Sequence, residues 1–360
     1  MVETVTVSII ILNFNGESCL EQCLSSVLKT KYPSFEVILF DNGSTDRSLI
    51  LAEARFGNDE RLRIIRAEKN LGFAIGNNEG FKHARGKYIV FLNNDTVTDP
   101  EWLAVLVDVM DKDLTVGVAQ SMILEINGKK IQEGGTGWMV DSYLTFRQAL
   151  GTNCCSEEFL DVFETSFAVG AAMITRRELI NEIGLFDPKF PFFYDDILLS
   201  FKAWLAGKRV VTVSKSRVCH IGSATFTRSG WDTYHVFNHV FRGLMALALN
   251  LYISLNDLLK ALFIFTFSVL IRDSGLGKNG RFNVALVTAY TSASVWTLRN
   301  LKYIWRSRVE NWTRAKITPD MLSSRFVKIG IPAHLYFLPA SYHEEEIKLA
   351  RNSLMKQKFH

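Results

Sequence analysis

The stretch Val7-Ser-Ile-Ile-Ile-Leu-Asn-Phe-Asn-Gly16 decides the fold of this chain. It is a short, mainly apolar run that ends abruptly in asparagine and glycine. Such a run is typical of a strand that is buried on both faces of a parallel sheet. We therefore expect a strand over Val5–Leu12, followed by a helix over Glu17–Lys29 that carries a leucine at every fourth position of one face.

The same alternation of short apolar runs and helical patterns continues to about residue 124. We expect further strands over Phe35–Phe40, Leu62–Arg66, Tyr88–Leu92 and Val116–Leu124. We expect helices over Ser48–Phe56, over Gly76–Ala84 and from Pro100 to about Met110. Strands that alternate with helices predict an α/β fold, in which a mostly parallel central sheet is flanked by helices.

Polar residues recur where the expected strands end. Asn13-Phe-Asn-Gly16 follows the first strand, Asp41 the second, Asn70 and Gly72 the third, and Asn93-Asn-Asp95 the fourth. Each could be a simple turn, but their recurrence indicates a ligand site, because the carboxyl ends of parallel strands meet at one edge of a sheet. Neither G-x-G-x-x-G after the first strand nor G-x-x-x-x-G-K-[ST] occurs, which argues against a dinucleotide dehydrogenase and a P-loop enzyme.

Composition and charge describe a globular chain with two different halves. The 360 residues are 48% hydrophobic and 22% charged, which excludes a disordered or fibrous protein. Residues 1–230 contain 24 Lys+Arg and 29 Asp+Glu, whereas residues 231–360 contain 17 and 8. This asymmetry predicts that the basic back half faces something anionic.

Carboxylates stand at two places that suit catalysis. Asp95 is the only acid in its turn, and hard cations such as Mg²⁺ are held by one or two carboxylates together with substrate phosphates. Asp195 and Asp196 follow an aromatic run, Phe192-Phe193-Tyr194. Neighbouring carboxylates that differ in exposure allow one to act as a base, whereas the alternative is a solvated helix cap. The apolar flanks of the pair favour the catalytic interpretation.

From Val5 to Ser229 the sequence resembles the inverting family-two glycosyltransferases, which have the GT-A nucleotide-sugar fold. The motifs that carry the resemblance, in consistent order, are Val7–Gly16, Phe40–Asp46, Asn70–Gly80, Leu92–Thr96, Gly170–Met173, Gly184–Asp187, Phe192–Asp196 and His220–Gly222. Within the family the chain is most similar to the rhamnosyltransferase-like branch that builds surface glycans. The resemblance implies transfer of a sugar from a nucleotide-sugar donor, UDP- or dTDP-linked, to a hydroxyl of a glycan or polyprenyl-linked acceptor.

The resemblance also implies roles for particular residues. The nucleotide-binding residues would be Asn13, Asn15, Asp41, Asn70, Gly72, Asn77 and Asn94. Asp95 and His220 would hold Mg²⁺ or Mn²⁺, although a lone histidine after a strand is more often a packed or capping residue. Asn93 stands where the family's D-x-D metal motif has its first acid.

Catalysis is expected to centre on the second acidic motif. Asp196 would be the catalytic base, with Asp195 beside it, in a single displacement that inverts the anomeric carbon. Leu198 stands where the family often has a further acid. Together with Asn93, this departure leaves open a catalytically silent scaffold that binds nucleotide-sugars or glycans. A sugar nucleotidyltransferase is a second alternative, but Asn13–Glu17 lacks the required Gly-rich loop with a basic residue.

The back half combines an apolar stretch with a basic, aromatic one. Gly243–Ile271 is interrupted only by the charges of Asp257 and Lys260, so helices lying in a membrane interface fit better than one span. Basic and aromatic residues follow, at Trp296, Arg299, Lys302, Tyr303, Trp305, Arg306, Arg308, Trp312, Arg314 and Lys316. We expect residues 243–316 to contact an anionic membrane surface, and no nucleic acid. The alternative is a buried helical pair inside a soluble domain or a homodimer.

We expect three parts: a transferase domain over 1–230, a helical domain over 231–317 and a tail with a terminal helix over 318–360. The five cysteines include an adjacent pair, Cys154–Cys155, but no C-x-x-C, which indicates reduced thiols. Val7–Leu12 is too short for a secretory signal peptide. The expected location is therefore the cytoplasmic face of the cell membrane, in a peripheral or monotopic arrangement.

Overall fold

The computed structural model describes residues 5–128, 131–132, 138–140, 145–147, 161–190, 194–221, 232–251, 258–259, 266 and 284–323. The chain divides into two compact units. The first comprises Met1–Thr136 with Leu150–Ser229, and the second comprises Gly137–Ala149 with Gly230–His360. Several expected features lie outside the described residues: the Cys154–Cys155 pair, Phe192-Phe193, Ala261–Ile271 apart from Thr266, and the tail from 324 onward. The division into three domains stays a prediction.

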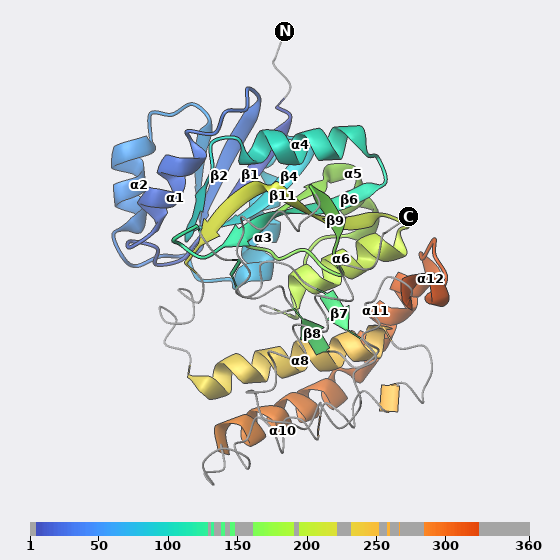
Figure 1. Cartoon of the computed structure of the whole chain (residues 1–360). Coiled ribbons are helices and arrows are strands. Elements are labelled where there is room, and N and C mark those ends of the chain that lie inside the picture. Colours follow the sequence, from blue (N-terminus) through green and yellow to red (C-terminus); the bar gives the residue numbers. More distant parts are fainter. Residues whose placement is uncertain are drawn as a thin grey trace. The chain divides into compact units, whose positions relative to one another are not determined.

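The first unit alternates strands and helices along most of its length (Figure 1). Its strands are β1 (Val7–Asn13), β2 (Phe35–Asp41), β3 (Leu62–Arg66), β4 (Tyr88–Asn93), β5 (Thr96–Thr98), β6 (Val116–Leu124), β9 (Val162–Glu164), β10 (Ala172–Arg176) and β11 (Arg209–His220). Its helices are α1 (Leu20–Val27), α2 (Ser48–Phe56), α3 (Phe73–Lys82), α4 (Trp102–Lys112), α5 (Arg177–Ile183) and α6 (Asp195–Leu205).

These strands form one mixed sheet in the order β3-β2-β1-β4-β10-β6-β11-β5, with β9 paired to β11. The strands β3, β2, β1 and β4 are parallel, which confirms the sequence-based expectation for this half. In the other half β10 runs antiparallel to both β4 and β6, and β11 runs antiparallel to β5 and β9. The alternation pattern had not predicted β10 and β11.

The chain order places a topological switch point between β1 and β4. From β1 the chain passes to β2 and β3 on one side, and then returns to add β4 on the other side of β1. The helices that follow β1 and β3 therefore diverge at this point, and ligands of α/β sheets bind at the carboxyl ends of strands beside such a divergence.

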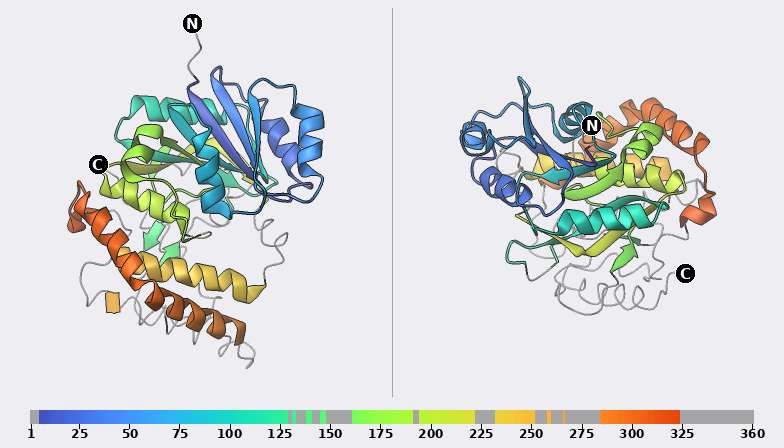
Figure 2. Two further views of the ribbon diagram at one scale, coloured as in Figure 1. Left: turned by 180° about the vertical axis from the view of Figure 1, so that it is seen from behind. Right: turned by 90° about the horizontal axis from the view of Figure 1, so that it is seen from above.

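Helices cover both faces of the central strands (Figures 1 and 2). On one face Ile9 packs in a buried cluster with Leu24 of α1 and Trp102 of α4. On the other face Gly80 of α3 lies so near Ile10 that a Cβ atom there would be 2.8 Å from the Ile10 Cγ2. Alternate residues of one apolar strand thus face two helical layers, as expected for a strand buried on both sides.

Two helices begin at residues that differ clearly from the expected starts. The helix expected from Glu17 begins at Leu20, because the Gly16 carbonyl first accepts the backbone N–H of Cys19 and closes a turn. The helix expected from Gly76 begins earlier, at Phe73, directly after Gly72 with its positive φ of 81°. In both cases the backbone of a glycine sets the start, which side-chain periodicity does not report.

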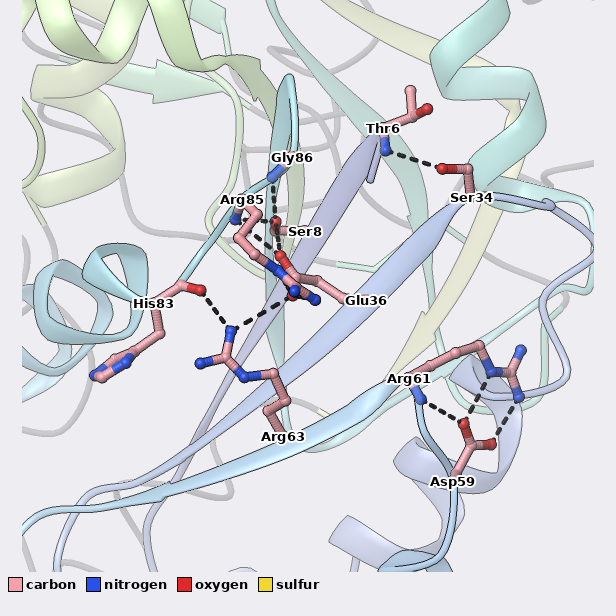
Figure 3. Close-up of polar contacts among 10 residues, drawn as sticks. All are labelled: Thr6, Ser8, Ser34, Glu36, Asp59, Arg61, Arg63, His83, Arg85 and Gly86. Carbon is pink, nitrogen blue, oxygen red and sulfur yellow. Dashed lines mark hydrogen bonds and ion pairs between the residues drawn. The ribbon is translucent and has the colours of Figure 1, made fainter. Parts of the chain in front are cut away.

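A buried carboxylate ties together the amino ends of β1 and β2, at the opposite strand ends from the switch point (Figure 3). The Glu36 side chain is 2% exposed, and its Oε1 accepts hydrogen bonds from Ser8 Oγ (2.7 Å) and the Arg85 backbone N–H (2.8 Å). Its Oε2 accepts from Arg85 Nε at 2.9 Å. Burial by itself raises the pKa of Glu36, but the hydrogen bonds from Arg85 and Ser8 outweigh it and hold the pKa below its usual value.

The second unit is helical in the part that the structure describes, apart from the hairpin of β7 (Trp138–Val140) and β8 (Thr145–Arg147). Its helices are α8 (Thr233–Leu251), α10 (Val284–Arg299), α11 (Leu301–Thr313) and α12 (Pro319–Ser323). A small core forms where Phe241 and Met245 of α8 meet Leu286 and Ala289 of α10. Among the described residues, no helix has both the length and the apolar character needed to cross a bilayer.

Several residues that the membrane hypothesis assigned to a lipid surface instead stabilise this unit. Arg308 Nη1 donates to the backbone carbonyls of Leu249 and Asn250, both at 2.8 Å, near the carboxyl end of α8. Trp312 Nε1 donates to the same Asn250 carbonyl at 2.8 Å, and Trp296 stacks beneath the guanidinium of Arg242. These three residues are partly buried and contribute to helix packing and to binding helix-end carbonyls, while the expected contact of residues 243–316 with an anionic membrane stays a prediction.

Candidate active site

Asn13 is the centre of a hydrogen-bond network at the switch point. In the sheet register Asn13 of β1 lies beside Asp41 of β2, and its side chain is fully buried. Asn13 Nδ2 lies 2.9 Å from Asp41 Oδ1, 3.1 Å from Ser44 Oγ and 3.0 Å from Ser48 Oγ. Asn94, just after β4, donates from Nδ2 to Asn13 Oδ1 at 2.8 Å. One amide thus joins the carboxyl ends of β1, β2 and β4.

The turn after Asn13 is shaped by close backbone approach. A Cβ atom on Gly16 would lie 2.2 Å from Asn13 Oδ1 and 2.6 Å from Asn94 Nδ2, so no other residue fits without displacing the network. Asn15 has a positive φ of 49°, and its Oδ1 accepts the Thr45 backbone N–H at 2.8 Å. Asn13 is therefore a buried organiser of the site, whereas Asn15 lies in the partly exposed turn between the ends of β1 and β2.

Asn42, which sequence reasoning missed, holds the loop after β3. Its Oδ1 accepts the Leu71 backbone N–H at 2.9 Å, and its Nδ2 donates to Asn70 Oδ1 at 3.0 Å. Gly72 donates its backbone N–H to the same Asn70 Oδ1 at 2.9 Å, so the predicted pair Asn70 and Gly72 lies in one clamped turn. Asn77, in contrast, is buried and donates to the Phe73 carbonyl of its own helix. The sequence signal for Asn42 was its position directly after Asp41, within the motif Phe40–Asp46.

Asp95 and His220 meet at the far side of the β4 end. The antiparallel pairing of β11 with β5 sets His220 beside Thr96, and His220 Nε2 lies 3.1 Å from Asp95 Oδ1. The Asp95 side chain is 4% exposed and the His220 side chain is 14% exposed. Asn93, at the position of the missing first acid, lies with Nδ2 3.2 Å from the same His220 Nε2.

The Asp95–His220 pair fits a six-coordinate divalent cation that takes its other ligands from elsewhere. Two neighbouring ligands at ~2.1 Å from an octahedral ion lie about 3.0 Å apart, and Asp95 Oδ1 and His220 Nε2 are 3.1 Å apart. Within the part of the chain that the structure describes, no three or more His, Cys, Asp or Glu residues gather around one point. Phosphate oxygens and water can complete the shell of a cation held by this pair, as is usual for Mg²⁺.

A second missed residue, Gln132, lies against His220. Gln132 Nε2 donates to the His220 backbone carbonyl at 2.9 Å, and its Oε1 lies 2.7 Å from His220 Nδ1. The backbone N–H of Gln132 donates to the Ile123 carbonyl at 3.1 Å, which attaches this segment to β6. No feature of the sequence marks Gln132, because it lies outside every motif.

Asp195 and Asp196 form the first turn of α6 and differ in exposure. Asp195 is buried, while Asp196 is partly exposed. Asp196 Oδ2 accepts the Gly170 backbone N–H at 3.0 Å, and its Oδ1 accepts the Ile197 backbone N–H at 2.8 Å. Burial raises the pKa of Asp195 well above its usual value, and the nearby Asp196 charge raises it further. Burial also raises the pKa of Asp196, against the opposing effect of the N–H groups of Gly170 and Ile197.

The segment before β10 links the acidic pair to the β4 end. Gly170 binds Asp196, and the next residue, Ala171, accepts the Asn93 backbone N–H at 3.0 Å. Asn93 in turn contacts His220. The structure therefore brings the predicted base, the predicted cation ligands and the Asn13 network to one end of the sheet, through the carboxyl end of β4.

Comparison with known proteins agrees with this architecture. Residues 8–184 match the model of the family described as glycosyl transferase family 2. An uncharacterized glycosyltransferase of Haemophilus influenzae is 32% identical over 30% of this chain and 33% of its own length. The O-antigen biosynthesis protein RfbC of Myxococcus xanthus is 30% identical over 62% of this chain, but the match spans only 18% of RfbC.

Solved structures share the fold at low sequence identity. GalNAc-T7, crystallised with UDP, GalNAc and Mn²⁺, superposes with a TM-score of 0.57 at 19% identity over 84% of this chain and 57% of its own. Residues 1–349 of S. aureus TarS, in complex with UDP, superpose with a TM-score of 0.51 at 17% identity over 99% of this chain and 93% of theirs. The expected GT-A architecture is thereby confirmed, and residues 8–184 carry an enzyme domain of the glycosyltransferase class.

Proposed function

We propose that this chain, whose residues 8–184 match the model of glycosyl transferase family 2, is an inverting, metal-assisted glycosyltransferase. It would move a sugar from a UDP- or dTDP-linked donor to a hydroxyl of a glycan or polyprenyl-linked acceptor, as a member of the rhamnosyltransferase-like branch. The observation that carries the proposal is the Asp95–His220 pair beside the Asn13 network at the switch point. GalNAc-T7, crystallised with UDP and Mn²⁺, and TarS, crystallised with UDP, support a nucleotide-linked donor and a divalent cation.

The residues around β1 and β4 would bind the donor. Asp95 and His220 would hold Mg²⁺ or Mn²⁺, which when bound offsets the negative charge that develops on the leaving nucleoside diphosphate. Asn15 lies in the partly exposed turn after β1, where it can contact the nucleotide, and Asn42 keeps the Asn70–Gly72 turn in place beside it. Asn13 supports this binding surface from within, because it is fully buried.

Asp196 would accept the proton of the acceptor hydroxyl. Because Asp195 is the more buried acid and has the more strongly raised pKa, it retains the proton when the pair holds one, and the negative charge stays on Asp196. The acceptor oxygen then forms a bond to the anomeric carbon while the bond to the diphosphate oxygen breaks, and its proton moves to Asp196. One displacement with one base inverts the anomeric configuration.

We also propose that the helical unit meets an anionic membrane surface at the cytoplasmic face. Arg308, Trp296 and Trp312 make contacts within the helical unit, so the residues that support this proposal are the exposed ones of α11. Leu301 is 42% exposed and Trp305 58%, and the exposed cations Lys302 and Arg306 lie on the same helix. An aromatic and basic helix surface of this kind suits anionic headgroups, and it would bring the transferase near a polyprenyl-linked acceptor.

The proposal is tested by following release of nucleoside diphosphate from UDP-, dTDP- and GDP-sugars with Mn²⁺ or Mg²⁺. We expect turnover of one donor, lost on chelation, reduced at least about 100-fold by Asp95→Asn, and reduced as strongly by Asp196→Asn once an acceptor is present. Asp108→Asn, an exposed surface acid on α4, is the matched control and should retain full activity. Donor binding without turnover by the wild-type chain under any of these conditions would instead identify the silent scaffold.

A further inference from the structure

We propose that Gln132 is a positioning residue that fixes the proton of His220 on Nδ1 and so gives Nε2 a lone pair that can bind a cation. The Gln132 side chain contacts His220 at two points, the backbone carbonyl at 2.9 Å and Nδ1 at 2.7 Å. The carbonyl oxygen can only accept a hydrogen bond, so it must face the NH₂ group of Gln132. The carbonyl oxygen of the Gln132 amide then faces Nδ1, and Nδ1 must carry the hydrogen.

The other ring nitrogen consequently has a lone pair. In neutral imidazole only one nitrogen bears a proton, so Nε2 is an acceptor when Nδ1 is a donor. Asn93 Nδ2, at 3.2 Å, is placed to donate to that lone pair. Asp95 Oδ1 lies 3.1 Å from the same nitrogen, so a lone pair and a carboxylate oxygen face each other, an arrangement that a positive ion between them stabilises.

Without Gln132 the opposite tautomer would be favoured. A hydrogen on Nε2 would donate directly to Asp95 Oδ1 at 3.1 Å, and this bond would occupy both cation ligands at once. Ligating histidines commonly donate their second N–H to a carbonyl or carboxylate, and loss of such a partner typically weakens metal binding 10- to 100-fold. Gln132 supplies that partner from a segment anchored to β6 through Ile123.

This inference rests on the proposed function insofar as it concerns cation binding, but its first test needs neither metal nor sugar. The tautomer of His220 is read from two-bond ¹H–¹⁵N correlations of the metal-free full chain at about pH 8, above the ordinary pKa of a free imidazole. The His220→Gln variant assigns the signal. We expect the Nδ1–H form in the wild type, a shift toward Nε2–H in Gln132→Met, and the Nδ1–H form again in Gln132→Glu, whose carboxylate can accept from Nδ1.

The second test measures Mn²⁺ affinity of the same proteins by calorimetry without any nucleotide-sugar. We expect binding to weaken about 10- to 100-fold in Gln132→Met and to recover at least in part in Gln132→Glu. Gln22→Met, at an exposed position of α1, is the matched control and should bind as the wild type does. An Nε2–H tautomer in the wild-type chain would overturn the inference, even if Gln132→Met failed to fold. Unchanged tautomer and affinity in a folded Gln132→Met protein would overturn it equally, whatever the outcome for transferase activity.

Discussion

The replacement Asn13→Asp tests whether one amide holds the site together. The variant has nearly the same shape, but it places a carboxylate oxygen where Asn13 Nδ2 lies, 2.9 Å from Asp41 Oδ1. Asn13 is fully buried and Asp41 is 3% exposed, so water cannot screen the two charges. Two carboxylates this close cannot both be ionised at little cost, and one must take up a proton.

The cost can be estimated from the contacts that change. A buried charge that has lost its partner costs ~3–5 kcal/mol, and the hydroxyl of Ser44, 3.1 Å away, can turn to donate to the new carboxylate and recover about 1 kcal/mol. We expect a net loss of about 3 kcal/mol in the free energy of unfolding at neutral pH. The folded variant holds its extra proton more tightly than the unfolded chain does. The loss is therefore full above the raised folded-state pKa and shrinks as the pH falls toward the ordinary aspartate range.

The assay is urea unfolding followed by tryptophan fluorescence at about pH 7.5 and pH 5, with the wild type measured at each pH. Trp102, buried in the core against β1, reports on this unit. Asn127→Asp is the matched control, because Asn127 also donates to a carboxylate, that of Glu125 at 3.2 Å, but is exposed. Its loss should stay below about 0.5 kcal/mol. A loss in Asn13→Asp no larger than in the control, or one that grows as the pH falls, would refute the reasoning.

Three further predictions follow from other contacts. Glu36→Gln removes charge-assisted hydrogen bonds from a side chain that is 2% exposed, and it should lower the free energy of unfolding by about 2–3 kcal/mol in a urea titration. Asp59→Asn, at a more exposed ion pair, should lower it by less than half of that. Arg308→Met removes the donor to the last carbonyls of α8 and should lower the free energy of unfolding by about 2 kcal/mol. Arg306→Met, at a side chain that is 81% exposed, is the control and should lower it by almost nothing. Equal losses of the two variants in thermal unfolding would contradict the capping role of Arg308. Because burial raises the pKa of Asp196, donor turnover to an acceptor should fall as the pH drops through that raised value. A pH–rate profile with no acid limb above the ordinary aspartate range would exclude Asp196 as the base.

The sequence was sufficient for the parts of the fold that local patterns encode. The four apolar runs from Val5 to Leu92 became the parallel strands β1 to β4, with ends within two residues of those expected. It failed for β10, which joins the sheet by pairing with β4 and β6, and for β11, which pairs with β6, β5 and β9. Such strands are defined by their pairing with strands that are distant in the sequence, rather than by local periodicity. The sequence of residues 172–176 alone does not predict a strand that runs antiparallel to its neighbours.

For the candidate site, the sequence by itself determined which polar residues stand at strand ends, because a strand's length and the residues that follow it are local properties. Only the tertiary structure decided which of them meet. Asn93 and His220 are 127 positions apart, and Gln132 reaches His220 from a segment that no motif marks. The same holds for Arg308, whose charge suggested a membrane while its contacts are with helix-end carbonyls. Hydrogen bonds between distant side chains depend on how loops and strands are brought together, so their partners emerge only when the chain is folded.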